Sequence, residues 1–466
     1  MPHAIAQSVE IVTTVLAIAG MGYFLAAVVG AHAYLFTRRA RLPLFTPGVS
    51  ILKSLKGIDP GMIDAFRSHC RQAYEGEFEL LFGVSSLDDP AVAPVAQLMK
   101  EFPQLAIHLV ECPQRLGTNG KVSTLTQLAA HARHNFLLIN DSDITVSPRY
   151  LERVMANFAP AQALYQGTTS EAAEKPNTEG GGGFNPRMKP TESSGASAPE
   201  GGLPPNSHEM PPLSATCLAP AGIRTANPRP QTGLVTALYR GRAHSTLPSR
   251  LEALGIATDF QAGVLLSKMI EGGMRFGLGS TLAVSREALD KIGGLESLVD
   301  HLADDYELGV RVFKAGYRVA LSAEVVETAI PAYEWRGFLD HQLRWARTVR
   351  DARPAGYAGL IFTHGLAWAL LNVLASGLSP VSLWLLGLSF FLRLALAMTV
   401  GAQVLADHQV LPNLWLLPFR DLLAMGVWVA GFAGNTIVWR GQRFLLKNGK
   451  LLPTEPPALS DATNRA

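Results

Sequence analysis

The chain has 466 residues and a formal net charge of only +2, so its length suits two or three domains and its charge gives no general affinity for nucleic acid. Charged residues make up 17% of the sequence, below the roughly 25% of ordinary soluble domains. Because the apolar residues that replace them gather in a few long runs, the composition favours a membrane protein. The cysteines have neither metal-ligand nor disulfide spacing and fit a reducing compartment; they are Cys70, Cys112 and Cys217.

The first long apolar run, Ile11–Thr37, contains no Asp, Glu, Lys or Arg and is long enough to cross a hydrocarbon core of about 30 Å. Arginines follow it directly, beginning at Arg38, and no Lys or Arg precedes it. The positive-inside rule therefore predicts an outside N-terminus and a cytoplasmic chain after Arg38. Ala31-His32-Ala33 has the form of a signal-peptidase site, but the basic n-region of a signal peptide is missing. We interpret residues 9–37 as an uncleaved transmembrane anchor.

Residues 45–161 carry the pattern of the first half of a soluble α/β domain. Short apolar runs predict strands at Val49–Leu52, Phe78–Val84, Leu105–Val110 and Phe136–Ile139. Stretches of helical pattern separate these runs, which is typical of βαβ units in a parallel sheet. Since ligands of such sheets bind beyond the carboxyl ends of the strands, polar residues that follow the strands should meet at one edge.

Candidate site residues stand at those positions. Lys53 follows the first strand, the pair Asp88-Asp89 follows the second, and Asp141 and Asp143 follow the fourth. If the strand continues, its period of two places Asp141 and Asp143 on the same side. Two such carboxylates can share a divalent cation with a phosphate ligand. Taken alone, this short motif is more often a solvated turn.

Between the third and fourth strands lies the segment Arg115–Lys121, with two glycines and an asparagine. These residues allow the backbone to approach a ligand closely or to adopt a positive φ. Lys121 could then counter the charge of a diphosphate. An ordinary turn with a solvated lysine is the simpler alternative, because the segment has no Walker pattern.

The segment Gln162–Thr232 is rich in Pro, Gly, Ser and Thr and almost lacks aromatic residues. We predict that it is a disordered surface insertion without chemistry. Residues 233–353 resume a folded pattern, beginning with a predicted strand at Gly233–Tyr239. The apolar stretch Leu251–Met269 fits either an interfacial helix at the membrane surface or a core helix.

Two further clusters lie in this second half. Asp304 and Asp305 stand at the start of a predicted helix that stops at Gly316. Acids are common at helix starts, but Asp305 is also a candidate base for an acceptor hydroxyl. Farther along, Arg344 could neutralise a leaving diphosphate and Trp345 could wall an acceptor pocket. The alternative for this pair is an amphipathic helix under the membrane, with arginine snorkelling to the surface.

Residues 357–440 are predicted to hold the C-terminal transmembrane helices, and 441–466 a tail. The uncharged stretch Pro354–Leu392 is broken near Ser379-Pro380, which predicts two helices in a tight hairpin, and Leu422–Trp439 is a third candidate span. Charges near these spans are expected to be paired or near the headgroups; they are Arg393, Arg420 and Asp421. Three spans would put basic residues outside, against the positive-inside rule, unless one segment is re-entrant. These residues are Arg440, Arg443, Lys447 and Lys450.

The motifs occur in one fixed order. They are Pro47-Gly48-Val49-Ser50-Ile51-Leu52-Lys53 with Lys56-Gly57, Asp88-Asp89-Pro90, Gly117-x-Asn119-x-Lys121, Asp141-Ser142-Asp143, Asp304-Asp305-Tyr306 and Arg344-Trp345. Together they resemble the ceramide glucosyltransferase family of membrane glycosyltransferases and the similar bacterial hopanoid-biosynthesis-associated glycosyltransferases. The resemblance covers nearly the whole chain except the Gln162–Thr232 insertion.

The resemblance implies an α/β, GT-A (Rossmann-like) catalytic domain that faces the cytoplasm. One N-terminal and two to three C-terminal transmembrane helices would hold it in the membrane, with the bacterial inner membrane as the expected location. It further implies inverting transfer of a sugar, expected to be glucose, from a UDP-sugar to the hydroxyl of a membrane lipid.

Residue by residue, the resemblance assigns Asp89, or else Asp88, to the nucleotide, with Lys53, Lys121 and Asp141 also on the nucleotide-sugar side. Asp141 and Asp143 match the acids that hold a divalent cation, Mg²⁺ or Mn²⁺. On the acceptor side, the catalytic set comprises Asp305 as base with Asp304, Arg344 and Trp345. His341 stands where the family motif has Gln or Arg, so the role of that position is open.

Other functions remain as alternatives. The acceptor could be a hopanoid polyol such as bacteriohopanetetrol, or diacylglycerol, rather than ceramide, and the donor UDP-N-acetylglucosamine. A processive polysaccharide synthase uses similar acids, but the few C-terminal spans argue against a polymer channel. A transporter or membrane scaffold would leave the ordered acids and Arg344-Trp345 unexplained.

Overall fold

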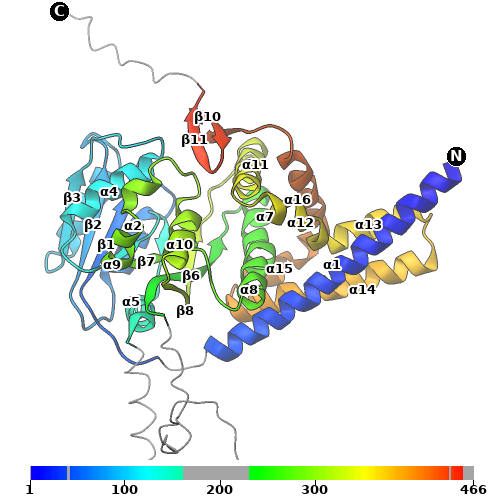
Figure 1. Ribbon diagram of the computed structural model, residues 1–466, viewed down its shortest axis with the longest axis horizontal. Coiled ribbons are helices and arrows are strands. Elements are labelled where there is room, and N and C mark those ends of the chain that lie inside the picture. Colours follow the sequence, from blue (N-terminus) through cyan, green and yellow to red (C-terminus); the bar gives the residue numbers. More distant parts are fainter. Residues whose placement is uncertain (1, 39–41, 161–229, 440–441, 455–466) are drawn as a thin grey trace, which may run out of the picture. The chain divides into compact units, whose positions relative to one another are not determined.

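The structure is a computed structural model that describes residues 2–38, 42–160, 230–439 and 442–454 (Figure 1). These residues belong to one compact unit. The predicted insertion Gln162–Thr232 therefore lies outside the described residues, apart from its last three positions. Thr232 itself begins a strand.

An eight-stranded sheet forms the centre of the catalytic domain, in the order β3-β2-β1-β4-β7-β6-β8-β5. Its parallel half consists of β1 (Val49–Ser54), β2 (Phe78–Val84), β3 (Ala106–Glu111) and β4 (Phe136–Ile139). This half confirms the four strands that the apolar runs predict.

The second half of the sheet is mixed. β7 (Leu282–Ser285) runs antiparallel between β4 and β6 (Thr232–Arg242), and β8 (Arg318–Ala329) runs parallel to β6. A short strand, β5 (Ile144–Thr145), closes this edge against β8. Apolar runs did not reveal β8, because Ser322 and Glu324 interrupt its hydrophobic pattern. Glu324 is buried there only because Arg153 pairs with it at 2.7 Å.

Alternate residues of the parallel strands enter two separate cores, as expected for a sheet covered on both faces. Ile51, Leu80 and Leu138 pack under α2 (Met62–Cys70), α3 (Val92–Glu101) and α5 (Tyr150–Met155, continued by the 3₁₀ turn Ala156–Phe158). Leu52, Leu81 and Leu137 belong to the opposite cluster. The helices of that side are α4 (Gly120–His131), α9 (Arg286–Lys291), the 3₁₀ turn Leu295–Leu298 and α10 (Asp304–Lys314).

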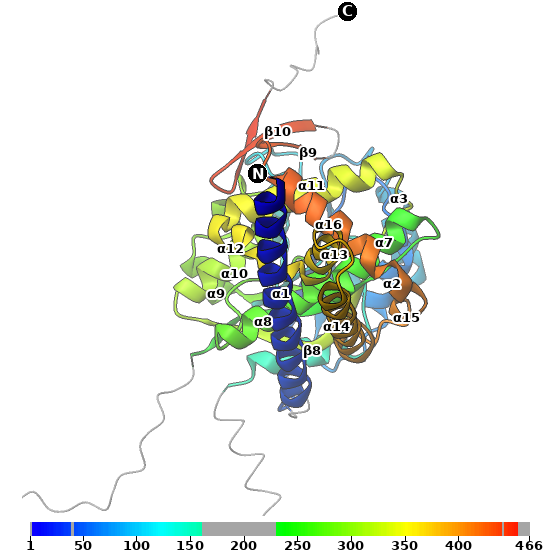
Figure 2. The same ribbon diagram turned by 90° about the vertical axis from the view of Figure 1, so that its right-hand side faces the viewer.

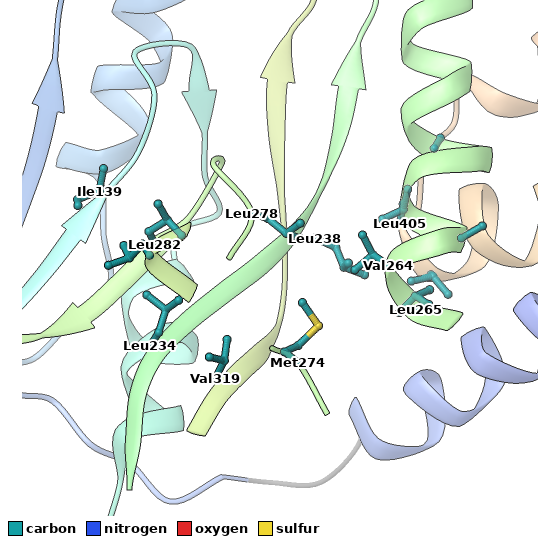
Figure 3. Close-up of a cluster of buried hydrophobic side chains, with 14 of the residues drawn as sticks. Ile139, Leu234, Leu238, Val264, Leu265, Met274, Leu278, Leu282, Val319 and Leu405 are labelled. Atoms are coloured by element: carbon teal, nitrogen blue, oxygen red, sulfur yellow. The ribbon is translucent and has the colours of Figure 1, made fainter. Parts of the chain in front are cut away.

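The second cluster extends without interruption to the membrane helices. The stretch Leu251–Met269 is helical, comprising α7 (Leu247–Gly255), a π-helical turn (Ile256–Phe260) and α8 (Gln261–Ile270). Figure 3 shows Val264 and Leu265 of α8 close to Leu238 and to Leu405. This packing supports the core alternative for α8, whose apolar residues belong to the same cluster as those of the sheet and the membrane helices.

Three long helices run side by side in Figures 1 and 2: α1 (Pro2–Arg38), α13 (Gly365–Ala375) and α14 (Pro380–Ala397). Small residues allow the closest approach, because a Cβ added at Gly20 would lie 2.2 Å from Gly365 Cα. The turn between α13 and α14 falls at the predicted Ser379-Pro380 break. Ahead of α13 come α11 (Trp335–Ala352), α12 (Pro354–Gly359) and a 3₁₀ turn (Leu360–Thr363).

Length and composition identify three helices able to cross a membrane: Ile5–Arg38, Pro380–Val404 and Val410–Gly431. A fourth is the pair Pro354–Thr363 and Gly365–Ala375, which is bent by 56°. Within the described ranges, the candidate spans agree with the expected number, one N-terminal and two or three C-terminal. The remaining segments here are a π-helical stretch (Met398–Val404), α15 (Val410–Asn413), a 3₁₀ turn (Leu414–Leu416) and α16 (Leu417–Gly431).

The charges in these helices are paired, as expected. Arg393 is 1% exposed and its Nε donates to Asp421 Oδ2 at 2.8 Å. Arg420 lies 3.3 Å from Asp259 of the π-helical turn in the catalytic domain. The charges therefore join the membrane helices to the domain.

The prediction of a span at Leu422–Trp439 is wrong in its second half. α16 ends at Gly431, and Thr436–Trp439 is a strand, β9, which pairs with β10 (Gln442–Lys447). β10 pairs on its other side with β11 (Lys450–Pro453). Within the expected tail 441–466, the described residues include the strands β10 and β11. The β-branched residues of β9 favour a strand, and Asn448 and Gly449, with φ of 53° and 77°, form a two-residue hairpin turn.

Candidate active site

Lys53 links β1 to the acids that follow β4. Its side chain is 1% exposed, and Nζ donates to the main-chain oxygen of Asp141 at 3.0 Å. Burial lowers the pKa of Lys53 to about 7, although the nearby Asp143 and Asp141 carboxylates oppose that shift. A cation so close to the acid turn offsets part of its negative charge.

Asp141 and Asp143 lie in the turn between β4 and β5 rather than on the strand, so the strand period does not set their directions. Buried Asn140 anchors this turn: its Nδ2 donates to Tyr150 Oη at 3.0 Å and to the main-chain oxygen of Ser280 at 2.6 Å. Its Oδ1 lies 3.2 Å from His69 Nε2. A buried amide with this many partners holds the turn in one conformation.

The two acids face different surroundings. Asp141 is 44% exposed and its Oδ1 lies 2.5 Å from Lys121 Nζ. Asp143 is more enclosed, and its Oδ2 accepts a hydrogen bond from Thr328 Oγ1 on β8 at 2.5 Å. Burial, together with the charge of Asp141, raises the pKa of Asp143 to about 6. Negative charge is thus concentrated at this turn.

The segment that carries Lys121 is docked on residues just before α10. Asn119 caps α4, accepting from Val122 N at 3.2 Å, and its Nδ2 donates to the main-chain oxygen of His301 at 2.8 Å. Thr118 N donates to Asp300 Oδ1 at 3.0 Å. The sequence analysis expects this segment to approach a ligand, which stays a prediction, and it does not foresee the contacts with Asp300 and His301.

Lys121 also meets the acids at the start of α10, with Nζ 3.9 Å from Asp304 Oδ2. Burial alone would lower the pKa of Lys121, but Asp141 and Asp304 outweigh it and raise that pKa. For Asp304 and Asp305 burial is the main cause of a raised pKa, with Lys121 opposing it. The structure therefore brings Asp141, Lys121, Asp304 and Asp305 together.

Asp305 sits against a glycine segment. Its Oδ1 accepts from Tyr306 N at 2.8 Å, and a Cβ added at Gly279 would lie 3.0 Å from its Oδ2. The absence of a side chain at Gly279 leaves room beside this carboxylate.

The acid pair after β2 divides in its roles. Asp89 Oδ1 accepts from Gly57 N at 2.8 Å and from Ala91 N at 2.9 Å, so it fixes the loop after β1, whereas Asp88 is exposed. An open hollow of about 450 Å³ is lined by Lys56, Gly57, Asp59 and Asp89.

Asp59 joins this hollow to the acid turn, because Ser142 Oγ donates to Asp59 Oδ2. The sequence analysis did not identify Asp59 as a site residue. The available sequence signal was the position of Asp59 in the loop after a predicted strand, two residues beyond Gly57. In the structure, Gly57 has a φ of 69°.

Arg344 and Trp345 lie on α11, which packs against α7. Burial raises the pKa of Tyr333, and the charges that act on it include those of Glu252, Arg344 and Asp143. The charge of Arg344 thus acts on the pKa of Tyr333, and so does the charge of Asp143 in the acid turn. Trp345 lies 6.1 Å from Phe260 in the π-helical turn, measured between ring centroids.

Glu252 and His341 are further residues that the sequence analysis did not assign. Glu252 is 3% exposed and its Oε2 lies 3.0 Å from His341 Nδ1, which is 3.2 Å from Tyr333 Oη. His341 also packs on Trp345, with ring centroids 5.1 Å apart. The side chain that contacts His341, at the motif position where the family has Gln or Arg, is therefore the buried Glu252.

The described residues contain no group of three or more His, Cys, Asp or Glu side chains arranged to hold a metal ion. Asp141 and Asp143 could still share a divalent cation whose other ligands come from a phosphate. The raised pKa of Asp143, caused by burial and by Asp141, fits such a cation, because carboxylates that repel each other gain from a shared positive charge.

Lysines and acids gather at the carboxyl edge of the parallel half of the sheet, in a domain packed against membrane helices, and this arrangement fits a membrane glycosyltransferase. The sequence model of glycosyl transferase family 21 matches residues 12–175 and 222–452. The chain belongs to this family. The internal gap in the match, residues 176–221, lies within the Gln162–Thr232 segment.

Among curated relatives, ceramide glucosyltransferase 3 of Caenorhabditis elegans is 24% identical over 421 residues, which are 87% of this chain and 74% of the relative. The ceramide glucosyltransferase of Komagataella phaffii is 30% identical over 124 residues, or 25% of this chain and 24% of the relative. These findings confirm the resemblance to ceramide glucosyltransferases and the enzyme class.

Two solved structures are also similar. The Pyrobaculum calidifontis mannosyltransferase PcManGT, in complex with GDP-Man and Mn²⁺, is 17% identical with a TM-score of 0.44 and covers 91% of this chain and 97% of its own. TarS residues 1–349 of S. aureus are 11% identical with a TM-score of 0.32, covering 88% and 99%.

Proposed function

We propose that the protein transfers a sugar, glucose in the first instance, from a UDP-sugar to the hydroxyl of a membrane lipid with inversion. One observation carries the proposal: Lys121 bridges Asp141 to Asp304, beside Asp305, in a domain whose apolar core continues into α8 and the membrane helices. A charged donor and an apolar acceptor can therefore reach the same place from opposite sides.

The donor side would use the lysines and the hollow. Lys53 and Lys121 offer positive charge to a diphosphate, and the hollow beside Asp59 and Asp89 offers room for a nucleotide. Asp141 and Asp143 would hold Mg²⁺ or Mn²⁺. That cation, when bound, supplies positive charge that offsets the charge of the leaving diphosphate.

On the acceptor side Asp305 would take the proton of the lipid hydroxyl as it attacks the anomeric carbon. Burial favours this role, because a base with a raised pKa holds the proton more firmly. Arg344 would stabilise the departing diphosphate, and Trp345, between His341 and Phe260, would form an apolar wall for the acceptor.

Ceramide is the first acceptor to test, because curated relatives that align with most of this chain are ceramide glucosyltransferases. A hopanoid polyol or diacylglycerol, with UDP-N-acetylglucosamine as an alternative donor, is the second choice. The hydroxyl chemistry proposed for Asp305 is the same for each.

The C-terminal sheet supports a proposal for the membrane topology. Leu451 N on β11 donates to the main-chain oxygen of Asp300 at 2.9 Å, so this sheet lies on the same side as the catalytic domain. An even number of crossings must then separate α11 from β9. We assign the crossings to α13 and α14, which pack on α1, and place α16 at the interface. The basic residues of β10 and β11 then lie in the cytoplasm, as the positive-inside rule requires.

Asp305→Asn should lower the turnover of UDP-glucose with ceramide by about 10²- to 10⁴-fold, because a general base of this kind contributes that much. Binding of UDP in the presence of Mn²⁺, measured by calorimetry, should stay within a few-fold of the wild type. The control is Asp290→Asn, an exposed acid on α9. Wild-type turnover in Asp305→Asn would refute the proposed base.

Asp304→Asn should move the acid limb of the kcat/KM profile to lower pH. Asp305 must be ionised to act, so activity is present above its pKa and is lost as the pH falls through it. The charge of Asp304 helps to raise the pKa of Asp305, so removing that charge should lower the pKa of Asp305. The profile is measured between about pH 4 and 8, around the ordinary and raised values for a carboxyl. An acid limb that stays in place or moves upward would contradict this coupling.

Single cysteines test the topology in a background that lacks the natural ones. Cysteines introduced at Ser8 and Leu378 should react with a membrane-impermeant maleimide in intact cells. One introduced at Asn448 should react only after the cells are permeabilised. Labelling of Asn448→Cys in intact cells would show that the number of C-terminal crossings is odd.

A further inference from the structure

The C-terminal sheet lies against two catalytic segments at once. Figure 1 shows β10 and β11 beside α11, and the tip of their hairpin is the Asn448-Gly449 turn. We call this element, residues 442–453, the C-terminal hairpin. Its function is not explained by donor binding or by membrane insertion.

One side of the hairpin holds the segment directly before the acid pair, residues 299–303. Leu302 N donates to the main-chain oxygen of Gly449 at 3.1 Å, and Leu451 N donates to that of Asp300 at 2.9 Å. Leu302 is 8% exposed and packs with Phe444, Leu446 and Leu451. Backbone pairing and an apolar contact thus fix the chain just ahead of Asp304.

The opposite side of residues 299–303 is fixed by the Lys121 segment. Asn119 N donates to the main-chain oxygen of Val299 at 2.7 Å, in addition to the contacts of Thr118 with Asp300. Residues 299–303 therefore lie between the segment that presents Lys121 and the hairpin. A displacement of the hairpin would reach both Lys121 and Asp304.

The hairpin also contacts α11, the helix of Arg344 and Trp345. Gly449 N donates to Asp351 Oδ2, two helical turns beyond Arg344. On the neighbouring strand β9, outside the hairpin, the main-chain oxygen of Thr436 accepts from Arg347 Nη1 of α11 at 2.5 Å. Gly449 therefore bonds to α11 through its N–H and to Leu302 through its carbonyl oxygen.

We propose that the C-terminal hairpin is a positioning element that holds α11 and the Asp304–Asp305 segment in register. It rests on the proposed function only in the roles of Asp305 and Arg344, which lie on the two elements it joins. Gly449 is the pivot: its φ is 77°, and an added Cβ would lie 3.4 Å from His301 Nδ1. The proposed coupling between α11 and residues 299–303 depends only on the contacts that each of them makes with the hairpin.

Asp351 tests the coupling, because its carboxylate is the α11 end of the bond to Gly449. Asp351→Ala removes the acceptor of this hydrogen bond. Asp351→Asn keeps an acceptor oxygen and should therefore preserve the bond. In hydrogen–deuterium exchange on the full chain in detergent, Asp351→Ala should speed exchange in residues 299–305 by about tenfold, the loss expected for a hydrogen bond to a charged group. The matched control is Asp340→Ala, an exposed acid on the same helix. Asp351→Asn and Asp340→Ala should exchange as the wild type does.

Leu446 and its neighbour Leu445, both on β10, provide a second test position and its matched control. Leu446 is 1% exposed and packs on Leu302, whereas Leu445 is 37% exposed. Leu446→Ala should speed exchange in residues 299–305 and lower kcat with UDP-glucose and ceramide about tenfold or more, with the KM for UDP-glucose changed far less. Leu445→Ala should do neither.

Two outcomes would overturn the proposal. One is wild-type exchange in residues 299–305 of Asp351→Ala. The other is faster exchange throughout the domain, including β2, which would mean a general loss of stability. The exchange result does not depend on the role of Asp305, so a fully active Asp305→Asn would refute the proposed function without deciding the coupling.

Discussion

The contact of Lys121 with Asp141 and Asp304 is the interaction on which the site depends. Asp141 follows β4 and Asp304 begins α10, so the lysine connects the parallel half of the sheet with the part that follows the insertion. Carboxylates that converge in a buried place repel one another and favour their protonated forms, as the raised pKa of Asp305 reflects. Lys121 and Lys53 offset part of that repulsion. In the proposed function, a bound divalent cation would offset the repulsion that remains between the carboxylates and would bind the diphosphate.

The apolar core imposes the second constraint. Alternate residues of the parallel strands fill two cores, and one of these continues through α8 to α1 and to the π-helical stretch near Leu405. The buried pair Arg393–Asp421 and the nearby Asp259 join the same elements through charge. Because the domain and the membrane helices share one core, the acids stand at a fixed place relative to these helices, as the proposed transfer to a membrane lipid requires.

The sequence predicts the parallel strands, the acid cluster and most spans, because each has a local signal: an apolar run, a polar residue after a strand, or a long uncharged stretch. It does not predict β8, whose alternation Ser322 and Glu324 hide, nor the end of α16, where an apolar run turns into β9. The pairing of Glu252 with His341 and the bond of Gly449 to Asp351 join residues far apart in sequence. Contacts of this kind arise from the tertiary fold, so no local pattern reveals them.

The central claim is that the acid cluster glycosylates a membrane lipid, and the most direct measurement is the product itself. Purified protein in vesicles that contain ceramide and a hopanoid polyol is incubated with isotopically labelled UDP-glucose or UDP-N-acetylglucosamine and Mn²⁺, and the lipids are analysed by mass spectrometry and by the anomeric configuration of the new bond. We expect one lipid to gain a single labelled sugar in the β configuration from the α-linked donor. A polymer, a retained α configuration, or release of free sugar without any glycosylated lipid would contradict the account.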